Sequence, residues 1–133
     1  MKSIFLDTNS YSRLHKGDNL VRKEVEKADA VYISVIVLGE LYRGFKQGSK
    51  ENLNIALLEK FLIGPHIATL NVSKSTARVY GKVSFNLRER GTPLPVNDVW
   101  IASQAIETDS TLITYDEHFL KVKGLKLWSR ILK

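Results

Sequence analysis

The sequence predicts one α/β domain built on a central, mostly parallel sheet of about four to five strands with helices on both faces. Short runs of β-branched and apolar residues alternate with longer helical segments along the chain. Spacing of this kind leaves room for the helical crossovers that connect parallel strands. The 133 residues contain no internal repeat, low-complexity tract or linker, so we expect residues 1–133 to form a single domain.

The first half of the chain predicts two strands, each followed by a pair of helices. Ser3–Leu6 is apolar and ends at a cluster of helix-capping residues, Asp7–Ser10. Ala30–Ser34 is rich in β-forming residues, and Gly48 is expected to end the helix that follows it. The expected helices run to about Lys16, from Asp18 through Ala28, from the second strand to Gly48, and over Lys50–Ile63.

The second half predicts three more strands and two long helices. A helix capped by Ser73 should end at Gly91, because apolar residues recur in it at helical spacing and Gly-Thr-Pro follows. A second helix should follow Pro95, with Ile101 and Ala105 facing inward. The expected strands are Ile67–Val72, Thr111–Thr114 and Leu125–Trp128.

Composition excludes several classes of site. Cysteine is absent, which rules out a disulfide scaffold, a thiolate zinc site and a cysteine nucleophile. No apolar run approaches the ~20 residues of a membrane span, and an acid at position 7 argues against a secretory signal, so we expect a cytoplasmic protein with no membrane partner.

The charge balance indicates the kind of partner. Lys and Arg number 20 against 14 Asp and Glu, for a formal net charge of +6 and a pI near 9.6. Such a balance in a small domain favours a polyanion, either nucleic acid or an acidic protein. Charge alone does not separate a nucleic-acid binder from a protein that is merely basic.

Four acidic residues follow or interrupt apolar segments, whereas the others lie among polar neighbours. Asp7 directly follows the first strand, and Asp116 follows the strand at Thr111–Thr114. Glu40 lies about two turns beyond the second strand, and Asp98 opens a later helix. Buried carboxylates usually have a partner, and the carboxyl ends of parallel strands meet at one edge of a sheet. We therefore expect the four acids to lie together at that edge.

Each of these acids also has an ordinary structural explanation. Asp7 is typical of a helix cap and Asp98 of a favourable first-turn acid. Glu40 can pair with Arg43 one turn along, and Asp116 can form a turn with the residues after it. Their shared position favours a common function over four unrelated roles.

Clustered carboxylates point to a divalent cation. They repel one another and raise one another's pKa values, and Mg²⁺ or Mn²⁺ relieves this because both ions prefer oxygen ligands. Such an ion polarises a phosphoryl oxygen and lowers the pKa of a bound water, so we expect phosphoryl chemistry. The chain has no Gly-x-Ser-x-Gly, Walker lysine or Gly-x-Gly-x-x-Gly motif, and no nucleotide cofactor is expected.

Four short motifs at matching order and spacing carry a resemblance that covers essentially the whole chain. They are Leu6-Asp7-Thr8-Asn9, Gly39-Glu40-Leu41, Pro95–Ala102 and Leu112–Asp116. These segments resemble the PIN domain, and their arrangement is similar to that of the VapC toxins of bacterial and archaeal toxin–antitoxin pairs. The resemblance implies a single PIN-like nuclease domain over residues 1–133.

The resemblance also implies an activity and a role for each acid. It implies a Mg²⁺- or Mn²⁺-dependent endoribonuclease that cuts RNA, often tRNA or rRNA, to 5′-phosphate and 3′-hydroxyl ends. Asp7 and Asp98 would be direct metal ligands, and Asp116 would bind the ion directly or through water. Glu40 would position or deprotonate the attacking water, completing a catalytic set of four.

Further implied features concern the surroundings of the acids and the partners. Asn9 and Thr114 would orient the acids by hydrogen bonds. The family implies a homodimer, an RNA substrate and a small antitoxin whose tail blocks the acidic groove.

Two surface patterns fit this resemblance without requiring it. Lys74, Arg78 and Lys82 form a basic stripe on one helix, which is either a solvated face or an RNA phosphate contact. The apolar stripe of Leu53–Leu62, together with Leu38, Leu41 and Tyr42, is either core or a surface for a second copy or an antitoxin.

Three other functions are less well supported by the sequence. A noncatalytic RNA-binding or regulatory module would keep its RNA affinity without the acids. An aspartyl phosphatase-like enzyme or a receiver-like phosphoacceptor would need a further acid beside the first strand, and position 9, where the phosphatase has its second acid, is Asn9.

Overall fold

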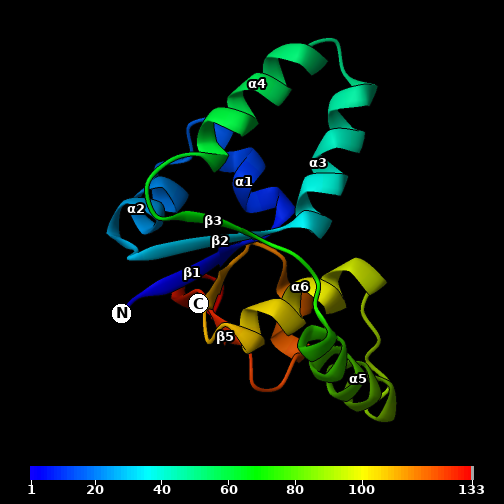
Figure 1. Cartoon of the computed structure of the whole chain (residues 1–133). Helices are drawn as coiled ribbons and strands as arrows, with labels where there is room; N and C mark the ends of the chain where they lie inside the picture. Colours follow the sequence, from blue (N-terminus) through cyan, green and yellow to red (C-terminus); the bar gives the residue numbers. More distant parts are fainter. Residues whose placement is uncertain (133) are drawn as a thin grey trace.

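A computed structural model describes residues 1–132 and confirms the predicted α/β architecture. All strand pairs are parallel, and the sheet has the order β3-β2-β1-β4-β5. Helices cover both faces of the sheet (Figure 1). The strands are β1 (Ser3–Leu6), β2 (Ala30–Ser34), β3 (Ile67–Leu70), β4 (Thr111–Ile113) and β5 (Lys126–Leu127).

The helices agree with the expected segments to within a few residues. Two short 3₁₀ helices, η1 and η2, follow β4 and β5 and were not expected, because they are too short to show a periodic pattern. None of the helices in residues 1–132 is long and apolar enough to cross a membrane. The helices are α1 (Thr8–His15), α2 (Asn19–Lys27), α3 (Val35–Gln47), α4 (Glu51–Leu62), α5 (Lys74–Glu89), α6 (Val96–Glu107), η1 (Glu117–Lys121) and η2 (Ser129–Leu132).

The strand order reverses direction between β1 and β4. The chain passes from β1 to β2 to β3 with α1–α4 on one face, and then crosses to β4 through α5 and α6 on the other face (Figure 1). β1 and β4 are paired, with Leu6 opposite Ile113, so their carboxyl ends lie side by side. In open parallel sheets, ligands bind in the crevice at such a reversal.

Apolar side chains pack against both faces of the sheet, because alternate strand residues point in opposite directions. Phe5 and Leu112 belong to a cluster with Val83 and Leu87 of α5. Ile4, Leu6 and Ile113 pack in a second cluster with Val21 and Val31. The sheet is therefore fixed from both sides, and the segments that leave β1 and β4 start from a rigid base.

Candidate active site

Asp7 ends β1 and begins α1, and its side chain is only 5% exposed. Its Oδ1 accepts a hydrogen bond from the Ser10 backbone N–H at 2.8 Å, which is the helix cap expected from the sequence. Its Oδ2 accepts the Thr114 hydroxyl at 2.5 Å. Burial raises the pKa of Asp7, and the hydrogen bonds from Thr114 and Ser10 oppose that rise. Capping and burial occur together at this carboxylate.

Two hydroxyl groups join the ends of β1 and β4. Thr114 is fully buried, donates to Asp7 and accepts the Asp116 backbone N–H at 2.9 Å. Ser10, also fully buried, donates to the carbonyl of Ile113 at 2.6 Å. Asp7 and Asp116 are thereby held on a shared support, although 109 positions separate them in the sequence.

Asp98 lies in the first turn of α6 and is half-buried. Its pKa is raised to about 6, mainly by burial and further by the negative charges of Asp116, Glu40 and Asp7. All three of the other predicted acids act on Asp98 through space. The structure thus brings the four acids into one region, as the sequence predicted.

Glu40 lies in α3 and connects three helices through its carboxylate. The Thr8 hydroxyl of α1 donates to Oε1 at 2.5 Å, and the Asn97 amide of α6 donates to Oε2 at 3.4 Å. Glu40, Arg43 and Asn97 line an open cavity of about 290 Å³. Within residues 1–132, Glu40 forms no ion pair with Arg43, so that structural explanation for its position is wrong.

Asp116 caps η1 and is partly exposed. Its Oδ1 accepts the His118 backbone N–H at 2.9 Å and lies 3.0 Å from His118 Nδ1. The His118 side chain is 65% exposed and faces solvent beside the acids. The turn expected at Asp116 is present. The negative charge of Asp116 also raises the pKa of Asp98.

Three polar residues around the acids received no role in the sequence analysis. Thr8, Ser10 and Asn97 each hydrogen-bond an acid or its support. The sequence signal that could have identified them is their position in the chain. Thr8 and Ser10 lie in the capping cluster Asp7–Ser10, and Asn97 directly precedes Asp98. Asn9, expected to orient the acids, is exposed on α1, and in the described chain its side chain makes no hydrogen bond to them.

The basic stripe of Lys74, Arg78 and Lys82 lies along α5. The start of α5 contacts Glu107, because the hydroxyls of Ser75 and Thr76 donate to the Glu107 carboxylate. Glu107 ends α6, nine residues and roughly 14 Å along the helix axis from Asp98. Lys74 therefore lies well away from the acids, and an RNA contact by this stripe stays a prediction.

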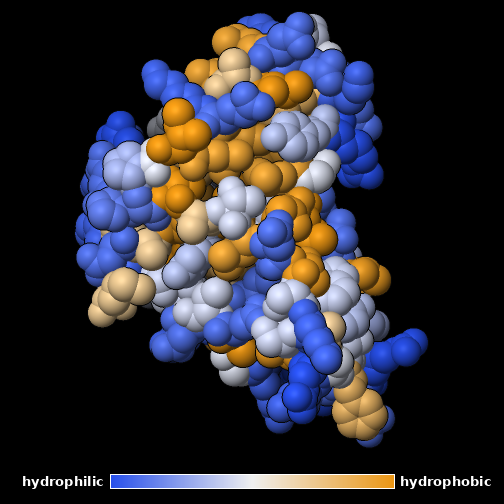
Figure 2. All heavy atoms as spheres, in the orientation of Figure 1, coloured by the Kyte–Doolittle hydropathy of each residue, from blue (hydrophilic) through white to orange (hydrophobic). Residues whose placement is uncertain are grey.

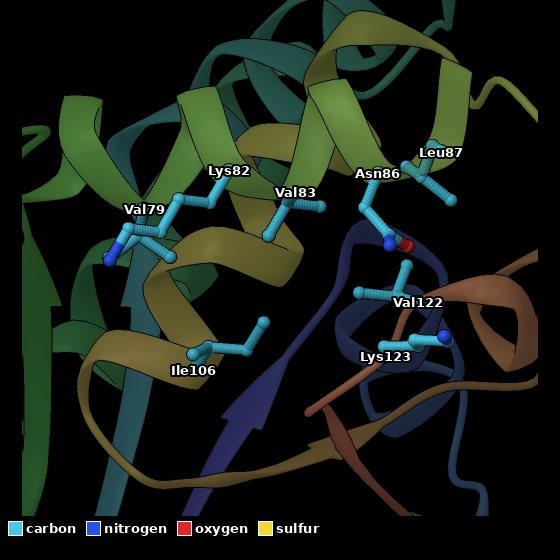
Figure 3. Close-up of a pocket in the computed structure, with 8 residues that line it drawn as sticks. All are labelled: Val79, Lys82, Val83, Asn86, Leu87, Ile106, Val122 and Lys123. Atoms are coloured by element: carbon cyan, nitrogen blue, oxygen red, sulfur yellow. The ribbon is translucent and has the colours of Figure 1, made fainter. Parts of the chain in front are cut away.

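A mostly apolar cavity of about 410 Å³ lies between α5, α6 and the segment after η1 (Figure 3). Val79, Val83 and Ile106 form its walls, with Lys82 and Lys123 at its border. None of the four acids lines this cavity. It is separate from the candidate active site.

The donor chemistry at the acids fits a hard divalent cation. Oxygen atoms of carboxylates are the ligands that Mg²⁺ and Mn²⁺ prefer, and the pKa of Asp98 is raised by burial and by the negative charges of three further carboxylates. In the described residues, no three His, Asp or Glu side chains are close enough together to hold a metal as they stand. Binding therefore requires side-chain adjustment or water ligands, which Mg²⁺ usually retains.

Comparison with known proteins places these observations in a family. The family described as "PIN domain" matches residues 4–125. Ribonuclease VapC2 of Rickettsia felis is 31% identical over 102 residues, covering 76% of this chain and 75% of that protein. Ribonuclease VapC5 of Mycobacterium tuberculosis is 28% identical over 119 residues, covering 90% of this chain and 87% of that protein.

A solved structure shares the whole architecture. It is the VapBC2 complex of Rickettsia felis bound to a DNA fragment from its promoter, in which a chain 28% identical to this one superposes with a TM-score of 0.84. The superposition covers 95% of this chain and 97% of the other.

Proposed function

This chain belongs to the PIN domain family and to the VapC ribonucleases within it, and we propose that it is a metal-dependent endoribonuclease that acts as the toxin of a toxin–antitoxin pair. We propose RNA, with tRNA or rRNA foremost, as its substrate, and 5′-phosphate and 3′-hydroxyl ends as its products. The observation that carries the proposal is the convergence of Asp7, Glu40 and Asp116 on Asp98 at the reversal of the sheet, where their negative charges contribute to the raised pKa of Asp98.

Asp7 and Asp98 are the proposed direct ligands of Mg²⁺ or Mn²⁺, and Asp116 binds directly or through water. When bound, the cation would polarise the phosphoryl oxygens and neutralise the charge that develops on them. Thr114 keeps one oxygen of Asp7 in place, and burial of Asp7 keeps that carboxylate from turning to solvent. These contacts support a preorganised orientation of Asp7.

Glu40 is the proposed positioning group for the attacking water. Thr8 and Asn97 each donate to one of its oxygens, so the carboxylate is oriented while other lone pairs stay available to a water. Water oxygen attacks the phosphorus, the bond from phosphorus to the 3′ oxygen breaks, and the departing 3′ oxygen takes up a proton. Glu40 accepts a proton from the water in this step.

The proposed antitoxin surface lies over α3 and α4. The apolar stripe predicted from the sequence is partly core and partly surface. Leu41 and Leu58 are buried, whereas Tyr42, Leu53 and Leu57 are 37%, 54% and 38% exposed. Figure 2 shows apolar side chains gathered over this part of the molecule. A surface of this kind suits an apolar partner segment, either the antitoxin or a second copy in a homodimer.

Incubation of the purified protein with total tRNA and rRNA tests the activity. We expect cleavage with Mn²⁺ or Mg²⁺, none in EDTA, and none by Asp7→Asn, which keeps a side chain able to cap α1. Asp109→Asn is the matched control, because Asp109 is 82% exposed in its side chain and pairs with Lys126. That variant should cut like wild type.

Two outcomes would overturn the proposal. Cleavage that survives Asp7→Asn and EDTA would remove the acidic metal site from the reaction. Absence of cleavage from both RNA pools, with wild type and Asp7→Asn binding RNA equally, would favour a noncatalytic RNA-binding module.

A further inference from the structure

One face of α1 is polar and basic and starts beside the acids. The residues on it recur at the i, i+3, i+4 and i+7 positions of a helix, so they form a single stripe. Since α1 begins directly after Asp7, the stripe leads away from the candidate active site, and its arginine lies about 9 Å along the helix axis from that acid. The stripe and the turn after it line an open cavity of about 500 Å³ formed by Asn9, Ser12, Arg13, Lys16, Gly17 and Asp18.

Arg13 is held in place by contacts that leave part of it free. Its guanidinium carbon lies 4.2 Å from the centre of the Tyr115 ring, and Nη1 lies 4.0 Å from Asp18 Oδ2. Tyr115 is fixed in turn, because its hydroxyl donates to Asp18 at 2.8 Å and its ring packs edge-on against Trp128. An arginine restrained in this way loses less conformational entropy when it binds an anion.

Arg13 pairs with Asp18 only at 4.0 Å, so the ion pair does not fully engage its guanidinium. The Asp18 carboxylate is occupied by the backbone N–H groups of Leu20 and Val21 and by the Tyr115 hydroxyl. The Arg13 side chain is 53% exposed, so N–H donors remain directed to solvent. Lys16, one turn further, forms no ion pair in the part of the chain that the structure describes.

Tyr115 connects this cation to the acids through the backbone. It lies between Thr114, which donates to Asp7, and Asp116, which acts on the pKa of Asp98. Tyr115 under Arg13 is thus adjacent in the chain to Asp116 and to the Thr114 hydroxyl that contacts Asp7. An anion on Arg13 is therefore placed in a defined relation to the acids.

We propose that Arg13, assisted by Lys16, binds a backbone phosphate of the RNA flanking the cleaved bond. The inference rests on the proposed ribonuclease function and adds a subsite to it. A guanidinium matches phosphate geometry with paired N–H donors, which a flexible ammonium does not. Phosphate contacts position the strand without selecting its sequence, so the subsite sets where the RNA lies rather than which bases are cut.

Binding of a fluorescent single-stranded RNA to the Asp7→Asn protein tests the subsite without cleavage. Adding Arg13→Ala should weaken binding about 5- to 10-fold and reduce the slope of log K against log salt by about 0.7. Arg13→Lys should bind with intermediate affinity. Arg22→Ala is the matched control, since it removes the same charge from an exposed position on α2 that does not line the cavity.

Cleavage kinetics in the wild-type background separate the subsite from a structural role. Arg13→Ala should raise KM with little change in kcat, whereas a distorted active site would lower kcat and leave the salt slope unchanged. If Arg13→Ala does not fold, Arg13→Gln keeps most of the packing on Tyr115 and replaces it in both assays.

The outcomes for the subsite and for the nuclease are distinct. Metal-dependent cleavage with an unchanged KM and salt slope in Arg13→Ala overturns the subsite and leaves the nuclease standing. Arg13-dependent RNA binding without any cleavage supports the subsite and overturns the nuclease. If Arg13→Ala and Arg22→Ala lower the RNA affinity equally, Arg13 contributes only general positive charge, and the subsite is overturned.

Discussion

Asp7 combines two roles that usually belong to different residues. One oxygen caps α1 through Ser10, and the other is buried against the Thr114 hydroxyl. The cap needs only a hydrogen-bond acceptor, whereas a cation needs the negative charge. Asparagine at this position therefore separates stability from metal binding, which is why it is the substitution of choice at the candidate active site.

Asp98→Asn should stabilise the metal-free protein at pH 7 while abolishing cleavage. The amide removes the cost of burying a charge and the repulsion from Asp116, Glu40 and Asp7, so we expect a gain of about 1 kcal/mol, or roughly 3–5 °C in Tm. Thermal unfolding in EDTA measures it. A Tm below that of wild type would show that Asp98 is needed for the fold and would contradict the electrostatic explanation.

Asp98 also makes the stability of the wild-type protein in EDTA depend on pH. The pKa of Asp98 is raised in the folded state to about 6, so folding favours the protonated form. Ionised Asp98 therefore destabilises the fold. This destabilisation is absent below about pH 4, where Asp98 is protonated in both the folded and the unfolded chain. It grows as the pH rises to about 6 and is complete above pH 6. We expect the Tm advantage of Asp98→Asn to vanish near pH 4, and an advantage independent of pH would contradict this assignment.

Thr114→Val should weaken both the fold and the metal site. Valine has nearly the shape of threonine but leaves Asp7 Oδ2 and the Asp116 N–H without their partner, at a cost of about 1–3 kcal/mol. Loss of such a supporting hydrogen bond typically lowers metal affinity about 10- to 100-fold. Chemical denaturation and Mn²⁺ titration measure the two effects. Thr114→Ser, which keeps the hydroxyl, should retain most of both.

At the scale of elements, α2 depends on its N-terminal cap. Asp18 accepts the N–H groups of Leu20 and Val21 and the hydroxyl of Tyr115, and the hydrogen bond from Val21 is the main cause of its lowered pKa. Asp18→Ala should reduce the free energy of unfolding by about 1–2 kcal/mol, and Asp18→Asn by less. Because the folded pKa lies below the unfolded value, this contribution is present above about pH 4 and is lost as the pH falls through the folded pKa. Urea unfolding at pH 7 and at pH 3 should show a smaller difference between Asp18→Ala and wild type at the lower pH.

Most elements could be predicted from sequence because their signals are local. Strand Ala30–Ser34 ends at a serine that caps the next helix, and Asp18 and Ser73 begin helices where capping residues precede apolar periodicity. The strands that begin at Ile67 and Lys126 are shorter than the predicted segments Ile67–Val72 and Leu125–Trp128. Each predicted segment extends beyond the residues that pair with a neighbouring strand. Pairing depends on the partner strand, which a local pattern does not contain.

The position of the acids could be predicted, but the residues that support them could not. The rule that parallel strands end at one edge brings Asp7 and Asp116 together without any knowledge of side chains. Whether Thr8 or Asn9 turns toward Glu40 depends on the rotation of α1 about its axis, which packing against the sheet sets. In the structure it is Thr8 that hydrogen-bonds Glu40.

At the scale of the whole molecule, a bound cation should stabilise the fold. Because an ion held by carboxylates from β1, α6 and the segment after β4 joins separate elements, Mn²⁺ or Mg²⁺ should raise the Tm. The gain should reach about 2.7 kcal/mol at 100 times the Kd. Scanning calorimetry measures the shift in wild type, Asp7→Asn and Asp109→Asn. Asp109→Asn should keep the full shift, and a shift of the same size in Asp7→Asn would place the ion elsewhere.

The position of β4 beside the central strand β1 has a consequence for the nascent chain on the ribosome. β1 ends at Leu6, but its neighbour β4 begins only at Thr111. At about 5–20 residues per second, β1 waits roughly 5–20 s for that neighbour. Asp7 and Asp116 therefore meet only after the 109 positions that separate them have been translated. An incomplete polypeptide ending before β4 holds separated acids without an assembled centre. The order of the strands thus delays assembly of the four acids until β4 has been synthesised.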